Sequence, residues 1–329
     1  MSKPDTKRRT KAKAAKVKKA ARLNSPRPPK ATDAPPYISN WIVGFLDMLG
    51  YRSVLSAFDA YPLPQDPAEQ ERLGRALGRA VKLRRRLLKQ ADALATEVGD
   101  LPDEVKLVSP AQRKDFMEAR KVHLIKDPGP DHIVLGTSLA PTAVHFPARG
   151  VYALLTNAAL LTLMQLWIGG DDPELALPLR GGIALAPGME APQEKFLYSP
   201  ALTCAYLLES ETAKVPRIVV QDRVVEFLDA ITHSNDPSTK GRIERTLAIR
   251  ARALIVTDSD GKYILDFYGE ALAKVINEKF SAEMSAKARK FVSDNLSEAR
   301  TKDNPGIVSK YEYLHKYMEE RAKFWPQLP

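Results

Sequence analysis

The chain has 329 residues, of which 44% are hydrophobic and 27% are charged, a composition typical of a soluble globular protein. Its length allows one large domain or two modest ones with an ample core. A single cysteine, Cys204, excludes an internal disulfide framework and a cysteine-based metal site. We therefore expect a reducing, cytoplasmic setting.

The net charge of +10 comes from the first 36 residues. They hold eight Lys and four Arg against two Asp, whereas the rest of the chain has 38 basic and 38 acidic residues. This segment has almost no large apolar side chains and lacks the apolar stretch of a secretory signal. We predict a disordered basic tail over 1–36, which either solubilises the protein or contacts nucleic acid or an acidic surface.

The first elements are a strand and two helices. The apolar run 41–51 predicts a strand, although it contains the acid Asp47. Residues 53–64 predict a short helix that stops at its prolines. Residues 67–98 predict one long helix with apolar residues at three- and four-residue steps. Its basic segment 82–89 predicts an exposed face or a partner contact, because no aromatic residues are interleaved with the cations.

The middle of the chain alternates strands and helices. Residues 132–146 predict a hairpin. The uncharged run 151–168 is at the short limit for a membrane span, but its polar residues favour a helix buried inside a globular protein. Residues 177–188 predict a strand, 199–210 a helix that starts at Ser-Pro, and 216–221 a short strand.

The last third continues this alternation. Residues 253–269 predict a hairpin with an Asp-Gly turn, and 281–300 and 307–324 predict helices. We expect 223–329 to pack on the same core as a hairpin and helical extension. The whole pattern predicts an α+β fold in which helices cover a mainly antiparallel sheet, with no membrane span.

Several segments, taken in order, resemble a known family. "VGFLDMLGYR", the hairpin, "LRGGIALAPG", "YSPALTCAYLLES" and "PRIVV" resemble the catalytic domain of class III nucleotidyl cyclases. The closer likeness is to the bacterial anti-phage branch of pyrimidine cyclases, the Pycsar type. The resemblance covers roughly 41–325. It implies a ferredoxin-like sheet, a cyclase-homology domain over 37–222 that contains the inserted helix 67–98, and a homodimer or a pair with a related cyclase subunit.

The resemblance also implies a chemistry. In that family two carboxylates hold two Mg²⁺ or Mn²⁺ ions, which bind a nucleoside triphosphate and activate the ribose 3′-hydroxyl. Asp47 takes the position of the first metal ligand and a catalytic role. Arg180 precedes the glycine pair and is expected to bind nucleotide. The backbone amides that follow Asp47 could cradle phosphate; they belong to Met48, Leu49, Gly50 and Tyr51.

Other motif positions depart from the family. Thr137 and Ser138 stand where the second metal-binding carboxylate belongs, so Ser138 marks a missing ligand. Thr203 replaces the Asn that positions the ribose and is carried over as a catalytic position, and Leu207 replaces the catalytic Arg. Asp131 is the only acid near the predicted hairpin and is expected at the far end of its strand. These changes predict a degenerate active site.

Simpler structural roles compete with these assignments. Asp47 could cap the turn after its strand, and the pair Gly181 and Gly182 could permit tight packing at a strand. Arg217 could form a salt bridge at the sheet edge. Acids 258 and 260 look like turn residues, and the five histidines fall at no metal-ligand spacing.

Three functions follow from the sequence. The first is a diverged cyclase-homology protein with weak or no cyclase activity, which binds nucleotide or dimerises in signalling, in keeping with antiviral defence. The second is an active pyrimidine cyclase that makes a 3′,5′-cyclic mononucleotide with Mg²⁺ or Mn²⁺. The third is a nucleic-acid-associated protein that binds through residues 1–36.

Overall fold

The computed structural model of the chain describes seven stretches, which are 38–51, 65–96, 123–125, 132–139, 146–191, 196–276 and 278–326. Residues 38–329 group into one compact unit. The predicted basic tail and the short helix predicted over 53–64 lie outside the described residues.

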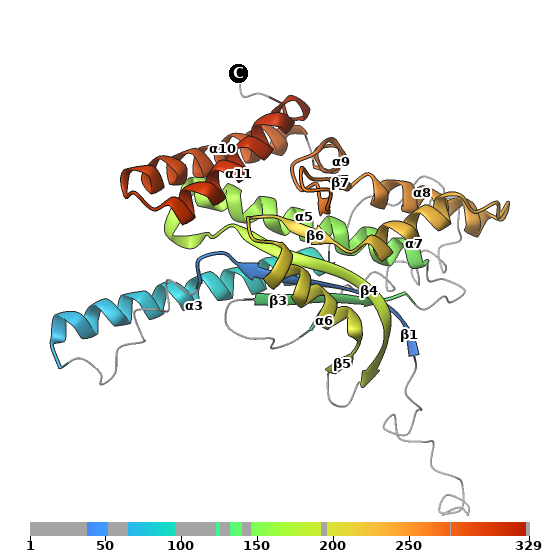
Figure 1. Cartoon of the computed structure of the whole chain (residues 1–329), viewed down its shortest axis with the longest axis horizontal. Helices are drawn as coiled ribbons and strands as arrows, with labels where there is room; N and C mark the ends of the chain where they lie inside the picture. Colours follow the sequence, from blue (N-terminus) through green and yellow to red (C-terminus); the bar gives the residue numbers. More distant parts are fainter. Residues whose placement is uncertain are drawn as a thin grey trace, which may run out of the picture. The chain divides into compact units, whose positions relative to one another are not determined.

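An eight-stranded sheet forms the centre of this unit (Figure 1). The strand order is β2-β3-β1-β4-β6-β8-β7, and β5 pairs with β4. The strands are β1 (Ile38–Met48), β2 (His123–Ile125), β3 (His132–Ser138), β4 (Leu179–Ala191), β5 (Phe196–Tyr198), β6 (Ile218–Val220), β7 (Ile255–Thr257) and β8 (Tyr263–Leu265).

Helices connect and cover these strands. They are α3 (Pro67–Thr96), α5 (Pro147–Asp171), α6 (Pro200–Leu207), α7 (Asp222–Thr232), α8 (Thr239–Arg252), α9 (Glu270–Ala273), α10 (Glu278–Thr301) and α11 (Pro305–Arg321). Short helical turns add η4 (Pro173–Leu175), η5 (Leu208–Thr212), which has π geometry, and η6 (Ala322–Phe324). The helices predicted over 67–98, 199–210, 281–300 and 307–324 correspond to α3, α6 with η5, α10, and α11 with η6.

The first four strands of the core have ferredoxin-like topology. β1 pairs antiparallel with both β3 and β4, and β3 pairs antiparallel with β2. The chain passes through α3 between β1 and β2 and through α5 between β3 and β4. This β-α-β-β-α-β order, with helices covering an antiparallel sheet, confirms the predicted α+β fold. Beyond it, β6 runs parallel to β4 after the α6 crossover.

The hairpin of this core differs from the predicted one. β3 pairs with β2, which precedes it, so the connection between them is 126–131 and not the segment after Ser138. β3 continues through Thr137 and Ser138, and residues 140–145 lie outside the described ranges. The placement of the hairpin turn at 137–138 was therefore wrong, and this bears directly on the candidate site.

The sheet has two differently covered faces (Figure 1). The even-numbered residues of β1, such as Ile42 and Leu46, join the large core beneath α5, α8 and α10. The odd-numbered residues Trp41, Val43 and Phe45 join a smaller core beneath α6. Because side chains alternate along a strand, Asp47 belongs to the α6 face.

The apolar helix α5 is the central element of the larger core. It is long and apolar enough to cross a membrane, and it is the one such helix among the described residues. However, 78% of its apolar window is buried inside the protein. Gly169 and Gly170 have no side chain, which lets α10 approach closely at Phe291 and Lys287. This burial favours the core-helix interpretation of 151–168.

A carboxylate from α8 meets the first turn of α5. The Ala148 N–H donates a hydrogen bond to the Glu244 carboxylate over 2.9 Å. Burial raises the pKa of Glu244 to about 7, and the hydrogen bond from Ala148 and the charge of Lys240 only partly oppose this. The folded protein therefore binds a proton at Glu244 more tightly than the unfolded chain does.

This predicts a pH dependence of stability. Between about pH 5 and 7 the folded state holds more protons at Glu244, so the free energy of unfolding should fall by about 2 kcal/mol as the pH rises. Glu244→Gln keeps an acceptor for Ala148 and removes the titration. Urea unfolding between pH 5 and 7 should show this fall in the free energy of unfolding for the wild type and not for the variant. An equal fall in both proteins would contradict the assignment of the bound proton to Glu244.

The last third of the chain belongs to the same unit. β8 pairs with β6, so the hairpin of β7 and β8 continues the sheet. At the other end, Asp266 accepts hydrogen bonds from Tyr317 Oη and Arg321 Nε, both over 2.6 Å. Trp325 Nε1 donates to the carbonyl of Tyr268 over 2.9 Å, and their rings stack. These contacts fasten α11 and η6 to the end of β8.

Candidate functional site

The candidate site is an ion-pair triad at the end of β1. Asp47 lies one residue before that end, and Arg180 is its cross-strand neighbour on β4. Arg180 Nε lies 2.9 Å from Asp47 Oδ2, and Arg180 Nη2 lies 2.7 Å from Glu209 Oε1. The three side chains are 13%, 23% and 4% exposed for Asp47, Arg180 and Glu209 respectively. The triad is therefore mostly withdrawn from water.

Local sequence chemistry brings Glu209 to this position. Ser199 caps α6 by accepting a hydrogen bond from the Ala201 N–H, and Pro200 fits the first helical position. α6 then crosses β4 at Gly182, where the carbonyl oxygen of Ala205 would lie 2.2 Å from any added Cβ. The chain widens into the π turn η5, which carries Glu209. Such π turns occur often at functional sites.

The triad explains how a strand can carry a carboxylate at a shielded position. Burying a carboxylate is costly unless a cation and hydrogen bonds compensate it, and Arg180 supplies both to Asp47. One guanidinium between two carboxylates leaves a net charge of −1. Since Arg180 occupies the place of a cation, the described carboxylates do not fit a divalent ion there. Within the described ranges, no group of three or more His, Cys, Asp or Glu could hold a metal.

An aromatic group lies beside the triad on the same face. Phe45 precedes Asp47 by two residues, and its ring stacks on His132 with centroids 4.5 Å apart. Tyr206 of α6 meets Phe45 edge-on at 5.4 Å and is 49% exposed. His132 is also the cross-strand partner of Asp47 on β3. The site therefore joins a charged triad to a partly exposed aromatic surface.

Two amides of the predicted phosphate cradle, those of Met48 and Leu49, belong to the strand pairing and to a turn. The Leu49 N–H donates to the Pro178 carbonyl over 2.9 Å, so this amide already has an acceptor. Met48 is paired with Leu179 inside the ladder of β1 and β4. Gly50 has a positive φ of 93°, which makes the tight turn that leaves the strand. The Tyr51 hydroxyl donates to the carbonyl of Ala80 and so ties this turn to α3.

The position assigned to the missing metal ligand was wrong. Ser138 is the cross-strand partner of Trp41, whereas Asp47 is paired with His132. Six residues of strand, about 20 Å, separate Ser138 from Asp47. Ser138 Oγ lies 2.6 Å from Ser39 Oγ at the other end of β1. Thr137 lies on the opposite face toward α5, where a Cβ added at Gly150 would lie 3.2 Å from Thr137 Cγ2.

The residue opposite Asp47 on β3 is His132, the first residue of that strand. The connection 126–131 leads from β2 to it. That connection contains Asp127 and Asp131. Its residues lie outside the described ranges. The placement of Asp131 at the far end of its strand stays a prediction.

The two positions of α6 that depart from the family motif are on the outer surface of the helix. Thr203 and Leu207 are both exposed, and neither belongs to the triad. In the sequence, Glu209 stands only at the end of a predicted helix. Its role as the second partner of Arg180 was missed, and the acid after an apolar helix, "LLES", was the available signal.

A second ionic cluster lies at the hairpin of β7 and β8. Arg217 donates to Asp258 over 2.5 Å and to Asp260 over 2.6 Å, and the Tyr313 hydroxyl donates to Asp258 over 2.8 Å. This confirms the salt bridge predicted for Arg217, and Gly261 has the positive φ of 79° that the predicted Asp-Gly turn requires. The cluster joins β6, the turn and α11 and has a structural role.

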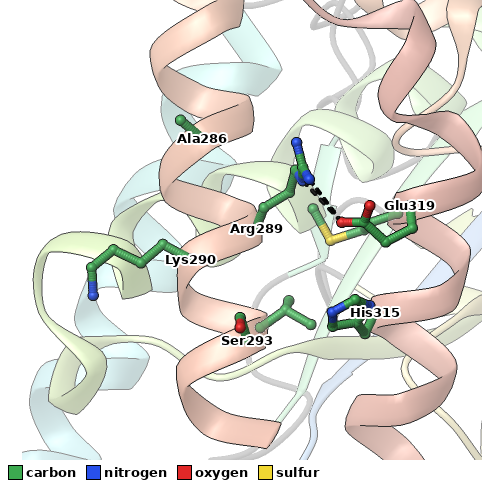
Figure 2. Close-up of a pocket in the computed structure, with 8 residues that line it drawn as sticks. Ala286, Arg289, Lys290, Ser293, His315 and Glu319 are labelled. Atoms are coloured by element: carbon green, nitrogen blue, oxygen red, sulfur yellow. Dashed lines mark hydrogen bonds and ion pairs between the residues drawn. The ribbon is translucent and has the colours of Figure 1, made fainter. Parts of the chain in front are cut away.

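A shallow hollow between α10 and α11 offers a volume of about 430 Å³ (Figure 2). Arg289 reaches across it to Glu319 over 2.9 Å, and Lys290 points away and pairs with Asp294. His315 and Ser293 complete its polar lining. Because both cations are already paired, the hollow has little attraction for an anionic ligand.

Comparisons with known proteins found similarity to solved structures. No family model and no curated protein matches the chain. Among solved structures, it is similar to a bacterial light-regulated adenylyl cyclase, with a TM-score of 0.32 and 14% identity over 68% of this chain and 58% of that one. It is also similar to a class III adenylyl cyclase-like ATP-binding protein from Pseudomonas aeruginosa. The TM-score is 0.34, with 13% identity over 84% of this chain and 44% of that one. The chain thus spans about half the length of these structures.

Proposed function

We propose that the protein is a nucleotide-binding module of the cyclase-homology type with little or no metal-dependent cyclase activity. The observation that supports this most directly is the guanidinium of Arg180 between Asp47 and Glu209, in the place of a cation at the end of β1. A site that already holds an internal cation gains little from a divalent ion, and two-ion chemistry needs both ions.

The neighbouring aromatic group supports nucleotide binding. A purine or pyrimidine base can stack on an exposed ring, and Tyr206 offers such a surface next to Phe45 and His132. The triad carries a net charge of −1, so this proposal places the base on the aromatic rings and assigns no phosphate contact to Arg180, whose guanidinium is oriented by the two carboxylates.

The test is a binding and turnover experiment on the full chain. Purified protein is incubated with Mn²⁺ and each of ATP, GTP, CTP and UTP, and cyclic mononucleotides are measured by mass spectrometry. Titration calorimetry measures nucleotide binding in parallel. We expect binding without a cyclic product, and we expect Tyr206→Ala to weaken that binding about tenfold. A cyclic product that disappears in Asp47→Ala would overturn the proposal.

Removing Arg180 should convert the triad into a metal site. Arg180→Met leaves Asp47 and Glu209 as two shielded carboxylates without their cation, so the variant should be less stable in metal-free buffer. Mn²⁺ should then raise its melting temperature by binding the folded state, whereas the wild type should respond little. Arg180→Met with Asp47→Asn is the matched control and should lose the response. An equal response of the wild type would show that Arg180 does not fill the cation position.

One observation favours a second candidate, an active cyclase. His132 stands opposite Asp47, and the acids Asp127 and Asp131 precede it closely in the sequence; under this alternative one of them supplies the second metal-binding carboxylate. Under this alternative, Asp131→Asn and Asp47→Asn each abolish a Mn²⁺-dependent cyclic product, and Ser138→Ala leaves it unchanged. Absence of product from the wild type eliminates this candidate.

The remaining features of the proposal rest on the family resemblance. We infer a cytoplasmic homodimer, or a pair with a related cyclase subunit, and a role in antiviral defence. The exposed side chains of α6, namely Thr203, Tyr206 and Leu207, offer a surface for such pairing. Sedimentation of the wild type and of Leu207→Glu tests it, because a charge at a paired apolar surface should produce monomers.

A further inference from the structure

The helix α3 carries a row of cations along one face. Lys82, Arg85, Arg86 and Lys89 are spaced three and four residues apart, which places them on neighbouring positions of the helix surface. Three of them, Lys82, Arg85 and Lys89, are exposed, and Arg86 is half-buried. We name these four residues the α3 basic stripe. It spans about 10 Å along the helix axis.

The stripe lacks the carboxylates that accompany cations elsewhere. None of its four members has an ion-pair partner among the described residues. The first half of α3 is different, because Arg75 pairs with Glu71 and Arg79 pairs with Glu174. On α10 and α11 the cations are interleaved with acids. Examples there are the pairs Lys287–Glu283, Lys290–Asp294, Arg289–Glu319, Arg300–Glu312 and Lys302–Glu298.

The stripe does not serve the stability of its own helix. Like charges four residues apart repel, as Lys82 with Arg86 and Arg85 with Lys89 do. The opposite face of α3 is committed to the core through the buried side chains of Leu83 and Leu87. Burial of that face holds the helix in a fixed rotation, so the stripe stays directed away from the core. An arrangement that costs helix stability and is held outward suits an anionic partner.

We propose that the α3 basic stripe binds the phosphate backbone of a double-stranded nucleic acid. A duplex carries one negative charge per about 1.7 Å of its axis, so a length equal to the stripe holds about six phosphates. Lysine and arginine heads at helical spacing can each meet one of them. This contact lies in the folded domain, is separate from the basic segment 1–36, and does not depend on the nucleotide proposal.

The composition of α3 favours a duplex over other polyanions. Single strands are held by stacking on aromatic side chains, and α3 has none. An anionic membrane would require a helix with a free apolar face, but the main apolar face of α3 is buried in the protein. Among the described residues of this helix, Leu77 and Val81 are the exposed large apolar side chains. Backbone phosphates need charge alone and therefore match best.

The salt dependence of binding tests this proposal with the full chain. The probe is a short fluorescein-labelled DNA duplex of mixed sequence, and its anisotropy is followed between about 50 and 200 mM NaCl. The variant Lys82→Gln, Arg85→Gln, Lys89→Gln removes three cations from the stripe. We expect it to bind at least about tenfold more weakly and to reduce the slope of log K against log salt by about 3.

A matched control removes the same charge elsewhere. Lys214, Lys262 and Lys316 are exposed and belong to other elements, so their joint replacement by Gln should leave affinity and slope close to the wild type. Circular dichroism checks that both triple variants fold. Unchanged duplex binding by the stripe variant overturns the proposal, as does an equal loss in the control. Loss of binding to phosphatidylserine vesicles with duplex binding intact also overturns it, in favour of a membrane contact.

Discussion

Gly182→Ala is expected to lower the free energy of unfolding by about 3 kcal/mol. The added Cβ would lie 2.2 Å from the carbonyl oxygen of Ala205 and 2.6 Å from Cβ of Leu208. A backbone carbonyl cannot rotate away as a flexible side chain can, so the whole of α6 must move off β4. That displacement would also draw Glu209 away from Arg180, and Tyr206 away from Phe45. Urea unfolding measures the loss of stability, and nucleotide titration measures the loss of the site.

Gly78→Ala provides the matched control for this prediction. It introduces the same methyl group in the interior of α3, where nothing lies within 4 Å of the added Cβ. Alanine favours a helix over glycine by up to about 1 kcal/mol, so this variant should be slightly more stable than the wild type. The same substitution thus has opposite signs at the two positions. Equal stability of Gly182→Ala and the wild type would show that α6 does not pack on β4 as described.

Arg217→Met is expected to destabilise the protein by about 3 kcal/mol at neutral pH. The Arg217 side chain is 9% exposed and that of Asp258 is 12% exposed, so the variant leaves a buried carboxylate without its cation. Arg252→Met is the matched control, because Arg252 is paired with Asp229 at 3.3 Å near the surface and both side chains are about one third exposed or more. Such a pair contributes less than about 1 kcal/mol. Equal effects of both substitutions would refute the structural role of the cluster.

The same variant should change the response to acid. Burial alone would raise the pKa of Asp258, but the hydrogen bonds from Arg217, the Ser259 N–H and Tyr313 outweigh it and hold that pKa below its usual value. The hydrogen bond from Arg217 also lowers the pKa of Asp260. Lowered pKa values mean that the unfolded chain binds protons more readily, so this stabilisation is present above about pH 4 and is lost as the pH falls further. The difference between the wild type and Arg217→Met should therefore shrink below pH 4.

Much of the fold could be predicted from the sequence because it depends on local patterns. The three- and four-residue apolar steps of 67–98 lead directly to α3, and the Ser-Pro start at 199 leads to the capped helix α6. The turn of the β7–β8 hairpin requires a residue with positive φ, and Gly261 supplies it. Each of these signals acts within a few residues, which is why a sequence reveals it.

The site was less predictable because cross-strand register joins distant residues. Asp47 stood out in the sequence as a carboxylate within a strand, yet its neighbours are Arg180 and His132, more than 80 positions away. The apolar run 132–146 predicted a hairpin turn at Ser138, although strand pairing places Ser138 opposite Trp41. The alternation of apolar residues along a strand indicates which side chains share a face, but it does not indicate the register between that strand and its partner.

The sequence by itself determined the α+β class, the identity of Asp47 as an unusual strand carboxylate, and the concentration of excess charge in 1–36. Only the tertiary structure decided that the cation of Asp47 is Arg180, that Glu209 shares it, and that the α3 basic stripe has no ion-pair partner within the described ranges. Periodicity and charge are properties of the chain that survive in any conformation. Ion pairs across 133 positions, by contrast, exist only once packing has fixed the register of the strands and brought α6 onto β4.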